Sequence, residues 1–384
     1  MYADHAATSH PVLFEAVPGY GNAAAGHRLG REARDAMDGA RRSVAASLRL
    51  PLTGDVSRHI IVTSGGTEAN NLIIQQPSWR YIVTLPTEHQ AVYLAAQAVC
   101  ADAACELVCL TPDGTGLVDL EELRAVLAEY AGRGPGLVSI AYVNNEIGAV
   151  QDLLAIGQEV KAVPGAYLHT DAVQAPGHVP VDLSSKGQLA LVDYLSLSAH
   201  KFHGPYGLGF LVCRQADGNG PLTHPLMFGG HQQNGLRPGT EPVGAAVAAA
   251  AALHAAVASD ARPLYLQLSS TVWSALLPFV LMGAVLPTGP GPTQRSPHIV
   301  SFCVRGAHRR DLAARLEREG VLASGGSACS TDSDLPSHVL AAIGVPPEYI
   351  HGSLRLSFGP GNTVEEANRV LVPALLRTLR AHSI

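Results

Sequence analysis

Short apolar runs alternate with longer stretches of helical spacing between residues 58 and 214. The runs HIIVT, YIVTL, LVSIAYV, AYLHT and DYLSLS are rich in β-branched and aromatic residues, and stretches such as EANNLII and LLAIGQEVKAV lie between them. Strands that alternate with helices in this way pair in parallel, with the helices packed on both faces. The pattern therefore predicts an α/β fold with a mostly parallel central sheet.

The pattern changes after an alanine-rich run at 243–257. A Pro/Gly-rich loop, LPTGPGPTQRSP, precedes a strand (HIVSFCV), a helix (RRDLAARLEREG), a second strand (GSLRLSF) and a C-terminal helix. A chain of 384 residues also exceeds the usual size of a single core. We therefore expect a large domain at 15–258 and a smaller α+β domain formed by 1–14 and 259–384.

Composition excludes several classes of function. A formal net charge of −6 with no Lys/Arg-rich run provides no basic face for nucleic acid. The N-terminus lacks the basic and apolar regions of a signal peptide, and the alanine-rich run is typical of a buried helix, so we expect a cytoplasmic protein without membrane association. The six cysteines form no C-x-x-C pair, which favours a reducing compartment, and no His/Cys cluster has ligand spacing, so no metal is predicted.

Most of the cysteines lie in apolar strings such as CELVCL and HIVSFCV, where a cysteine behaves as a small buried hydrophobic residue. Cys329 is the exception, because it lies in the Gly/Ser-rich segment SGGSACSTDSD.

Polar clusters follow several of the predicted strands directly. In parallel sheets, chemistry gathers at the carboxyl ends of the strands, because these ends meet at one edge. We therefore expect the site to be built from these clusters. They are Ser64-Gly65-Gly66-Thr67, Asn144-Asn145-Glu146, Thr170-Asp171 and Ser198-Ala199-His200-Lys201.

The chain offers few candidates for an amine that reacts with an aldehyde. It holds three lysines, Lys161, Lys186 and Lys201, against 23 arginines. Lys201 follows the apolar run DYLSLSAH, a context that would bury its amine, and burial keeps more of a lysine in the neutral, nucleophilic form. Lys201 is therefore the candidate for an imine with a cofactor, although a lysine after a strand is more commonly a surface residue.

A Gly-rich turn at 64–68 lies between a strand and a helical stretch. Such a turn exposes main-chain N–H groups at a helix N-terminus, which suits a phosphate. The alternative is an ordinary turn in which Thr67 caps the helix.

Asp171 follows the run AYLHT, where a strand should end. A buried carboxylate needs a partner, and the protonated nitrogen of a pyridine cofactor is one that would keep it ionised. A helix N-cap is the alternative. An imine, a phosphate site and a partner for a ring nitrogen are mutually consistent, and together they indicate pyridoxal 5′-phosphate.

The chain resembles the NifS/IscS-like cysteine desulfurases, which are class V, fold-type I pyridoxal-phosphate enzymes, and it is also similar to selenocysteine lyases. The resemblance covers nearly the whole chain. It is carried by YADHAATS (2–9), TSGGTEANN (63–71), TEH (87–89), VNNEIGAVQD (143–152), HTDAVQAPG (169–177), SAHKFHGPYGLGFL (198–211), GGHQQNGLRPGTEP (229–242), SGGSACSTD (324–332) and LRLSFG (354–359).

The resemblance implies a role for each matching side chain. Lys201 would carry the cofactor, Asp171 would pair with its ring nitrogen, Gln174 would approach the ring hydroxyl, and His89 would stack on the ring and move protons. Asn145 and Arg355 would hold the substrate, Arg355 by a bidentate contact with its carboxylate. The phosphate would be held by Gly66, Thr67, Ser198 and His200, and by Thr240 from the partner subunit of a homodimer.

The resemblance also implies that Cys329 is the nucleophile that accepts the sulfur. The expected reaction converts L-cysteine to L-alanine and leaves a persulfide on Cys329, which a sulfur-acceptor protein could then receive. A thiolate is a suitable acceptor, and a segment rich in Gly and Ser could carry it into and out of the site.

Three other functions stay open at this stage. A selenocysteine lyase would use the same lysine, aspartate and cysteine to release selenium from L-selenocysteine. A silent dimeric scaffold of the same fold would have no need for all of these side chains, and an ordinary aminotransferase would have no need for Cys329. Two strings depart from the family pattern: GNAAAGH (21–27) lacks the usual Asn-Pro-Ser, and the stretch 71–81 is short, with Pro77 ending its helix early.

Overall fold

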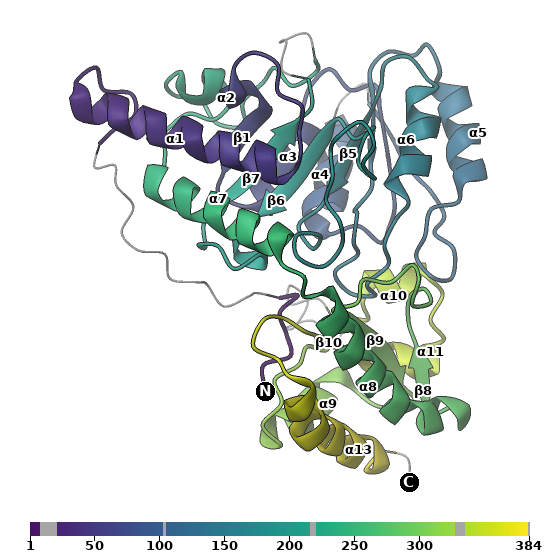
Figure 1. The fold of residues 1–384 in the computed structure, drawn as a ribbon. Helices are drawn as coiled ribbons and strands as arrows, with labels where there is room; N and C mark the ends of the chain where they lie inside the picture. Colours follow the sequence, from purple (N-terminus) through teal and green to yellow (C-terminus); the bar gives the residue numbers. More distant parts are fainter. Residues whose placement is uncertain (8–20, 103–104, 216–219, 327–334, 383–384) are drawn as a thin grey trace.

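Two β-sheets organise the chain in the computed structural model (Figure 1). The structure describes residues 1–7, 21–102, 105–215, 220–326 and 335–382. The larger sheet within these ranges consists of β1 (Ile60–Thr63), β2 (Tyr81–Thr84), β3 (Glu106–Cys109), β4 (Gly136–Ser139), β5 (Ala166–Asp171), β6 (Tyr194–Ser198) and β7 (Gly209–Cys213). The smaller sheet consists of β8 (Val285–Pro287), β9 (Ile299–Val304) and β10 (Ser353–Ser357).

The larger sheet is mostly parallel, as the sequence predicts. Its strands lie in the order β1-β7-β6-β5-β4-β2-β3. Strand β7 is antiparallel to both of its neighbours, β1 and β6, and every other pairing is parallel. The carboxyl ends of all the strands except β7 therefore meet at one edge.

Helices cover both faces of this sheet. Side chains alternate across a strand, so Ile60 and Val62 of β1 pack in the core on one face and Ile61 packs in the core on the other. The first face carries α1 (Arg28–Ser47), α5 (Leu120–Tyr130), α6 (Leu153–Lys161) and α7 (Val243–Ala258), and the second carries α3 (Gly66–Ile74) and α4 (Gln90–Asp102). Two short helices, α2 (Val56–His59) and η2 (Gln232–Gly235), complete this part of the chain, and Val56 of α2 packs in the core of the first face.

The smaller sheet has a hydrophobic core of its own. Phe302 of β9 and Leu356 of β10 pack there against Leu268 of α8 (Arg262–Leu281) and Leu312 of α9 (Arg309–Arg318). The other helices of this part are α10 (His338–Ala342), α11 (Pro347–Ile350), α12 (Val364–Glu366), the π-helical turn η4 (Ala367–Leu371) and α13 (Val372–Arg380). The predicted boundaries at 14/15 and 258/259 stay a prediction.

Helix α8 is, in the described part of the chain, long and apolar enough by length and composition to cross a membrane. Its buried residues include Leu268, Val272 and Leu276, which pack in the core of the smaller sheet. A third of its apolar window is buried in the structure, while Leu277 and Leu281 are exposed.

Residues 1–7 form a segment that we call the N-terminal strap. Ala3 lies in the core of the smaller sheet, where its N–H donates to the carbonyl of Leu322 at 2.9 Å and its carbonyl accepts from the N–H of Ser357 at 2.9 Å. The N–H of Ala6 donates to the Ser357 hydroxyl at 2.9 Å. These hydrogen bonds fix the strap to β10 and to Leu322, which follows α9 in the chain. From there the strap continues toward the larger sheet.

Candidate active site

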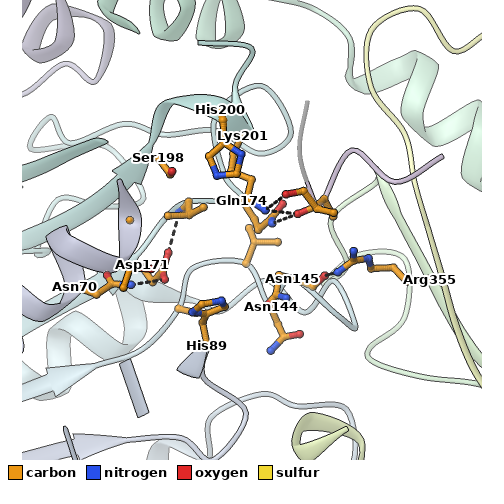
Figure 2. A pocket seen from close by; sticks show the side chains of 17 residues that line it. Asn70, His89, Asn144, Asn145, Asp171, Gln174, Ser198, His200, Lys201 and Arg355 are labelled. Atoms are coloured by element: carbon orange, nitrogen blue, oxygen red, sulfur yellow. Dashed lines mark hydrogen bonds between the residues drawn. The ribbon is translucent and has the colours of Figure 1, made fainter. Parts of the chain in front are cut away.

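A cavity of about 260 Å³ opens at the edge where the carboxyl ends of the parallel strands meet (Figure 2). Its walls come from the residues that follow β1, β2, β4, β5 and β6, from the strap and from β10. The structure brings most of the sequence-predicted site residues together here. They are Gly66, Thr67, His89, Asn145, Asp171, Gln174, Ser198, His200, Lys201 and Arg355.

Lys201 lies one short turn beyond β6. Every residue of β6 is buried, and the 3₁₀ turn η1 (Ala199–Lys201) follows it directly. The Lys201 amine donates hydrogen bonds to the main-chain carbonyls of Ala6 and Ala7, the second at 2.8 Å. The amine is therefore held at the cavity wall and not directed into bulk solvent.

Gln174 contacts the same part of the strap. Its side-chain amide donates to the carbonyl of Ala6 at 2.9 Å, and Gln174 itself is buried. The carbonyl of Ala6 thus accepts from both Gln174 and Lys201, which links the strap to two residues of the larger sheet's edge.

Asp171 ends β5 and is buried at the cavity wall. Its Oδ2 accepts from the Asn70 side chain at 2.7 Å, and its Oδ1 accepts from the Val173 N–H at 3.0 Å (Figure 2). No helix begins at this position, so the N-cap alternative is wrong. A carboxylate fixed at both oxygens still has lone pairs for a cationic N–H inside the cavity.

His89 lies directly before α4, at the end of the loop that follows β2. Its Nδ1 accepts from the Ala91 N–H at 3.1 Å, so Nδ1 carries no proton and a neutral ring carries its proton on Nε2. Burial lowers the pKa of His89, and the nearby Lys201 adds to this effect, whereas Asp171 opposes it. The neutral imidazole is therefore the favoured form near neutral pH.

The Gly-rich turn between β1 and α3 leaves the start of the helix open. Gly65 is the N-cap residue and provides no side-chain hydrogen bond, so the alternative in which Thr67 caps the helix is wrong. A Cβ on Gly66 would lie 2.7 Å from Cγ2 of Val173 and 3.5 Å from Cβ of Ser198. Only glycine therefore fits here without displacing Val173. Gly66 and Thr67, the first residues of α3, line the cavity together with Ser198, and the first N–H groups of a helix have no partner within the helix.

His200 lines the cavity beside Lys201. Burial lowers the pKa of His200 to about 4, and the neighbouring Lys201 contributes to the shift. Its ring stacks with that of Tyr206, with 5.6 Å between the centroids. At neutral pH His200 is uncharged, so it would contact a phosphate as a neutral hydrogen-bond donor.

Arg355 reaches the cavity from β10 and is almost completely buried. Its Nη1 donates to the carbonyl of Asn145 at 2.7 Å, and its Nη2 donates to Oδ1 of Asp4 at 2.8 Å. Its Nε has no hydrogen-bond partner among the described residues. The guanidinium is thus fixed in position and keeps N–H groups for a further acceptor.

The cavity lining leaves two predicted residues to account for, of which Thr240 is described and does not line the cavity. Thr240 is exposed, and its predicted role in a partner subunit's site stays a prediction. Cys329 lies outside the described residues. The chain leading to it passes Ser324, which pairs with Arg355 through an antiparallel β-bridge, so the last described residues before Cys329 lie beside the site.

The structure adds site residues that the sequence analysis did not assign. Asn70 binds Asp171, and Asp4 binds Arg355. Glu88 is buried next to His89, and burial, with a smaller effect of Asp171, raises its pKa to about 8. Asn70, Asp4 and Glu88 lie within TSGGTEANN, YADHAATS and TEH, three of the strings that carry the family resemblance. Their position within these strings was the sequence signal that could have identified them as site residues.

The chain matches one protein-family model along residues 1–370, that of the aminotransferase class-V family. It is 35% identical to the cysteine desulfurase IscS of Dictyoglomus turgidum, over 97% of this chain and 92% of that protein. It is 36% identical to the cysteine desulfurase IscS of Methanosarcina thermophila, over 99% of this chain and 93% of that protein.

Solved structures show the same similarity. A NifS-like protein superposes with a TM-score of 0.82 at 29% identity, covering 100% of this chain and 99% of that chain. The structure of SspA in complex with cysteine gives a TM-score of 0.73 at 26% identity, covering 94% of this chain and 99% of that chain.

Proposed function

The chain belongs to the cysteine desulfurase group of the aminotransferase class-V family, and from that premise we propose that it uses pyridoxal phosphate on Lys201 to take sulfur from L-cysteine. One observation carries the proposal. The Lys201 amine, the Asp171 carboxylate and the His89 ring line a single cavity, and the Arg355 guanidinium reaches that cavity from the smaller sheet.

The side chains of the cavity fit the cofactor. The open N-terminus of α3 and the space that Gly66 leaves suit a phosphate, and Asp171 keeps lone pairs for a protonated ring nitrogen. In the order of the sheet, β6, which leads to Lys201, lies between β1, which leads to the turn, and β5, which ends at Asp171. When bound, pyridoxal phosphate supplies an electron sink that allows bonds at the substrate's α- and β-carbons to be broken.

The protein's own groups bind the substrate and move protons. Arg355, held by Asp4 and by the Asn145 carbonyl, offers its remaining N–H groups to the substrate carboxylate. The Lys201 amine and the Nε2 side of neutral His89 line the same cavity, and either group can take or return a proton within it.

The transfer to Cys329 balances as a nucleophilic displacement at the substrate's sulfur, in which the electron pair of the broken bond leaves with carbon. The bond between Cβ of L-cysteine and its sulfur breaks, and a bond forms between that sulfur and Sγ of Cys329. The carbon gains a proton and leaves as L-alanine, while Cys329 becomes a persulfide. This step uses the thiolate of Cys329 as nucleophile and requires no external oxidant or reductant.

Incubation of the purified protein with pyridoxal phosphate and L-cysteine tests the proposal. We expect L-alanine and a persulfide that a thiol reductant releases as sulfide, and we expect both to disappear in Cys329→Ser. A parallel assay with L-selenocysteine separates the desulfurase from a selenocysteine lyase. Turnover of L-selenocysteine alone would overturn the proposal, as would amino-group transfer that survives in Cys329→Ser without any release of sulfur.

Replacing Asp4 by asparagine should lower KM for L-cysteine by about three- to tenfold. Asparagine keeps an oxygen for the Arg355 N–H but removes a negative charge beside the substrate carboxylate. In a partly buried site, the repulsion between two like charges several ångströms apart is large enough to change KM by this factor. Steady-state kinetics measure the change.

The control is Asp4→Ala, which loses the acceptor that holds Arg355 at 2.8 Å and should raise KM. An equal rise of KM in both variants would show that the charge of Asp4 has no effect on carboxylate binding.

Replacing Gly66 by alanine should weaken binding of pyridoxal phosphate by about tenfold or more. The new Cβ would lie 2.7 Å from Val173, whose N–H binds Asp171, so relief of the clash displaces a residue that fixes Asp171. Absorbance titration of the cofactor-free protein measures the affinity. Gly39→Ala, at an exposed position of α1, is the matched control, because its Cβ would meet nothing within 4 Å and should leave the affinity unchanged.

The proposed enzyme is a homodimer. Thr240 is exposed and lies in a segment with two large exposed apolar side chains, Phe228 (92% exposed) and Met227 (45%), which supports burial of this surface by a second copy. Sedimentation of wild type and Phe228→Asp tests this, with a dimer expected for the first and a monomer for the second. A monomeric wild type at micromolar concentration would contradict it.

A further inference from the structure

Three cysteines lie on or next to the edge strand β3 of the larger sheet and do not line the cavity. Cys100 lies near the end of α4, Cys105 directly precedes β3, and Cys109 ends β3. The expectation that such cysteines are buried holds for Cys105, whereas Cys100 is half-buried and Cys109 is exposed. The reason is that β3 is an edge strand, paired with β2 on one side, so part of each side chain stays at the surface.

The sulfur atoms of Cys100 and Cys105 are 3.1 Å apart. A disulfide bond has an S–S distance of about 2.05 Å, so an approach of about 1 Å would join them. A surface depression lined by the two cysteines and by Gln97, Ala101 and Leu107 gives solutes access to the pair. The two thiols therefore face each other, and the half-buried Cys100 can be reached from this depression.

We infer that Cys100 and Cys105 form an oxidisable dithiol, which a small-molecule disulfide converts into an intramolecular disulfide bond. With oxidised glutathione, the thiolate of one cysteine attacks a glutathione sulfur, releases one reduced glutathione and forms a mixed disulfide. The thiolate of the other cysteine then attacks the protein sulfur of that mixed disulfide and releases the second reduced glutathione. The two electrons and the two thiol protons end on the two glutathione molecules. This site is independent of the proposed function.

Cys100 is the attacking thiol and Cys105 the resolving one. Cys100 is the more exposed of the two. Burial raises the pKa of both thiols, but the hydrogen bond between them opposes this rise for Cys100 and adds to it for Cys105. Because both pKa values are raised, the reaction is slow at neutral pH and faster at higher pH.

The disulfide bond would connect the C-terminal end of α4, the helix that follows His89, to the start of β3. Helix α4 begins at Gln90, directly after His89, and Cys100 lies in its last turns. Oxidation would tie this end of the helix to the start of β3. We therefore expect the oxidised protein to unfold at a higher temperature than the reduced protein.

Thiol counting after treatment with oxidised glutathione tests the inference. The background is Cys329→Ser, which removes the proposed persulfide position and leaves five of the six cysteines. At pH 8.5 we expect the number of thiols titrated in the denatured protein to fall from five to three. Proteolysis before Asp102 and after Glu106 separates all three cysteines, so mass spectrometry without reduction should find the Cys100 and Cys105 peptides joined.

Two further variants in the same background identify the roles. In Cys105→Ser, glutathione should remain bound to Cys100, and in Cys109→Ser the Cys100–Cys105 bond should form as before. Five thiols remaining after treatment, a bond that includes Cys109, or covalent dimers as the main product would each overturn the inference. None of these results depends on turnover of L-cysteine.

Discussion

Replacing Lys201 by alanine is expected to lower the rate of L-alanine formation from L-cysteine by at least about 10³-fold, because the variant loses both the amine that attaches the cofactor and a general acid–base. The structure holds this amine against the carbonyls of Ala6 and Ala7 at the wall of the cavity that Asp171 and His89 share. No other lysine lines that cavity within the described residues. No other lysine of the described residues can therefore replace the Lys201 amine, and the loss of L-alanine formation should be close to complete.

The chain provides a matched control for this variant. Lys186→Ala removes an exposed lysine outside the cavity and should retain the wild-type rate and cofactor content. Reduction with borohydride, followed by peptide mapping, should attach the cofactor to Lys201 in wild type and in Lys186→Ala, and to no lysine in Lys201→Ala. Labelling of Lys161 or Lys186 in the wild-type protein would contradict the assignment.

Local pattern was sufficient to predict the framework of the site. Runs of β-branched residues placed the parallel strands, and polar residues directly after them placed Asp171 and Lys201 at one sheet edge, where the structure has them. This works because strand direction, once the sheet is parallel, decides which ends meet. The reversed direction of strand β7 (GFLVC) was not predicted, since an apolar run does not reveal its direction.

The hydrophobic pattern could not predict polar contacts between distant parts of the chain. Asp4 and Arg355 are 351 residues apart, and Asn70 and Asp171 are 101 apart. Hydrophobic periodicity describes which face of an element is buried, but it does not say which polar side chain of another element will pair there. The strap's carbonyl contacts with Lys201 were likewise unpredictable, because every residue has a carbonyl and its placement depends on the assembled fold.

Replacing Asp171 by asparagine is expected to lower kcat by about 10- to 10³-fold. Asparagine can still accept from the Val173 N–H, but it has no charge to hold a proton on the cofactor's ring nitrogen, and an opposite charge at this range shifts a pKa by about one to three units. Without that proton the ring withdraws electrons less strongly. The loss should fall on kcat more than on KM, because Asp171 lies on a different wall from Arg355 and does not contact it in the structure.

The pH profile of kcat/KM separates an electrostatic role of the Asp171 charge from a merely structural role of its side chain. The carboxylate of Asp171 raises the pKa of His89 against the stronger effect of burial, so its removal should lower that pKa further and move the acid limb of kcat/KM to lower pH. Asn70→Ala is the matched control, because it removes the 2.7 Å hydrogen bond to Asp171 but keeps the charge. It should lose less activity and leave the acid limb near the wild-type position. Equal losses with unshifted profiles in both variants would mean that Asp171 contributes its shape and not its charge.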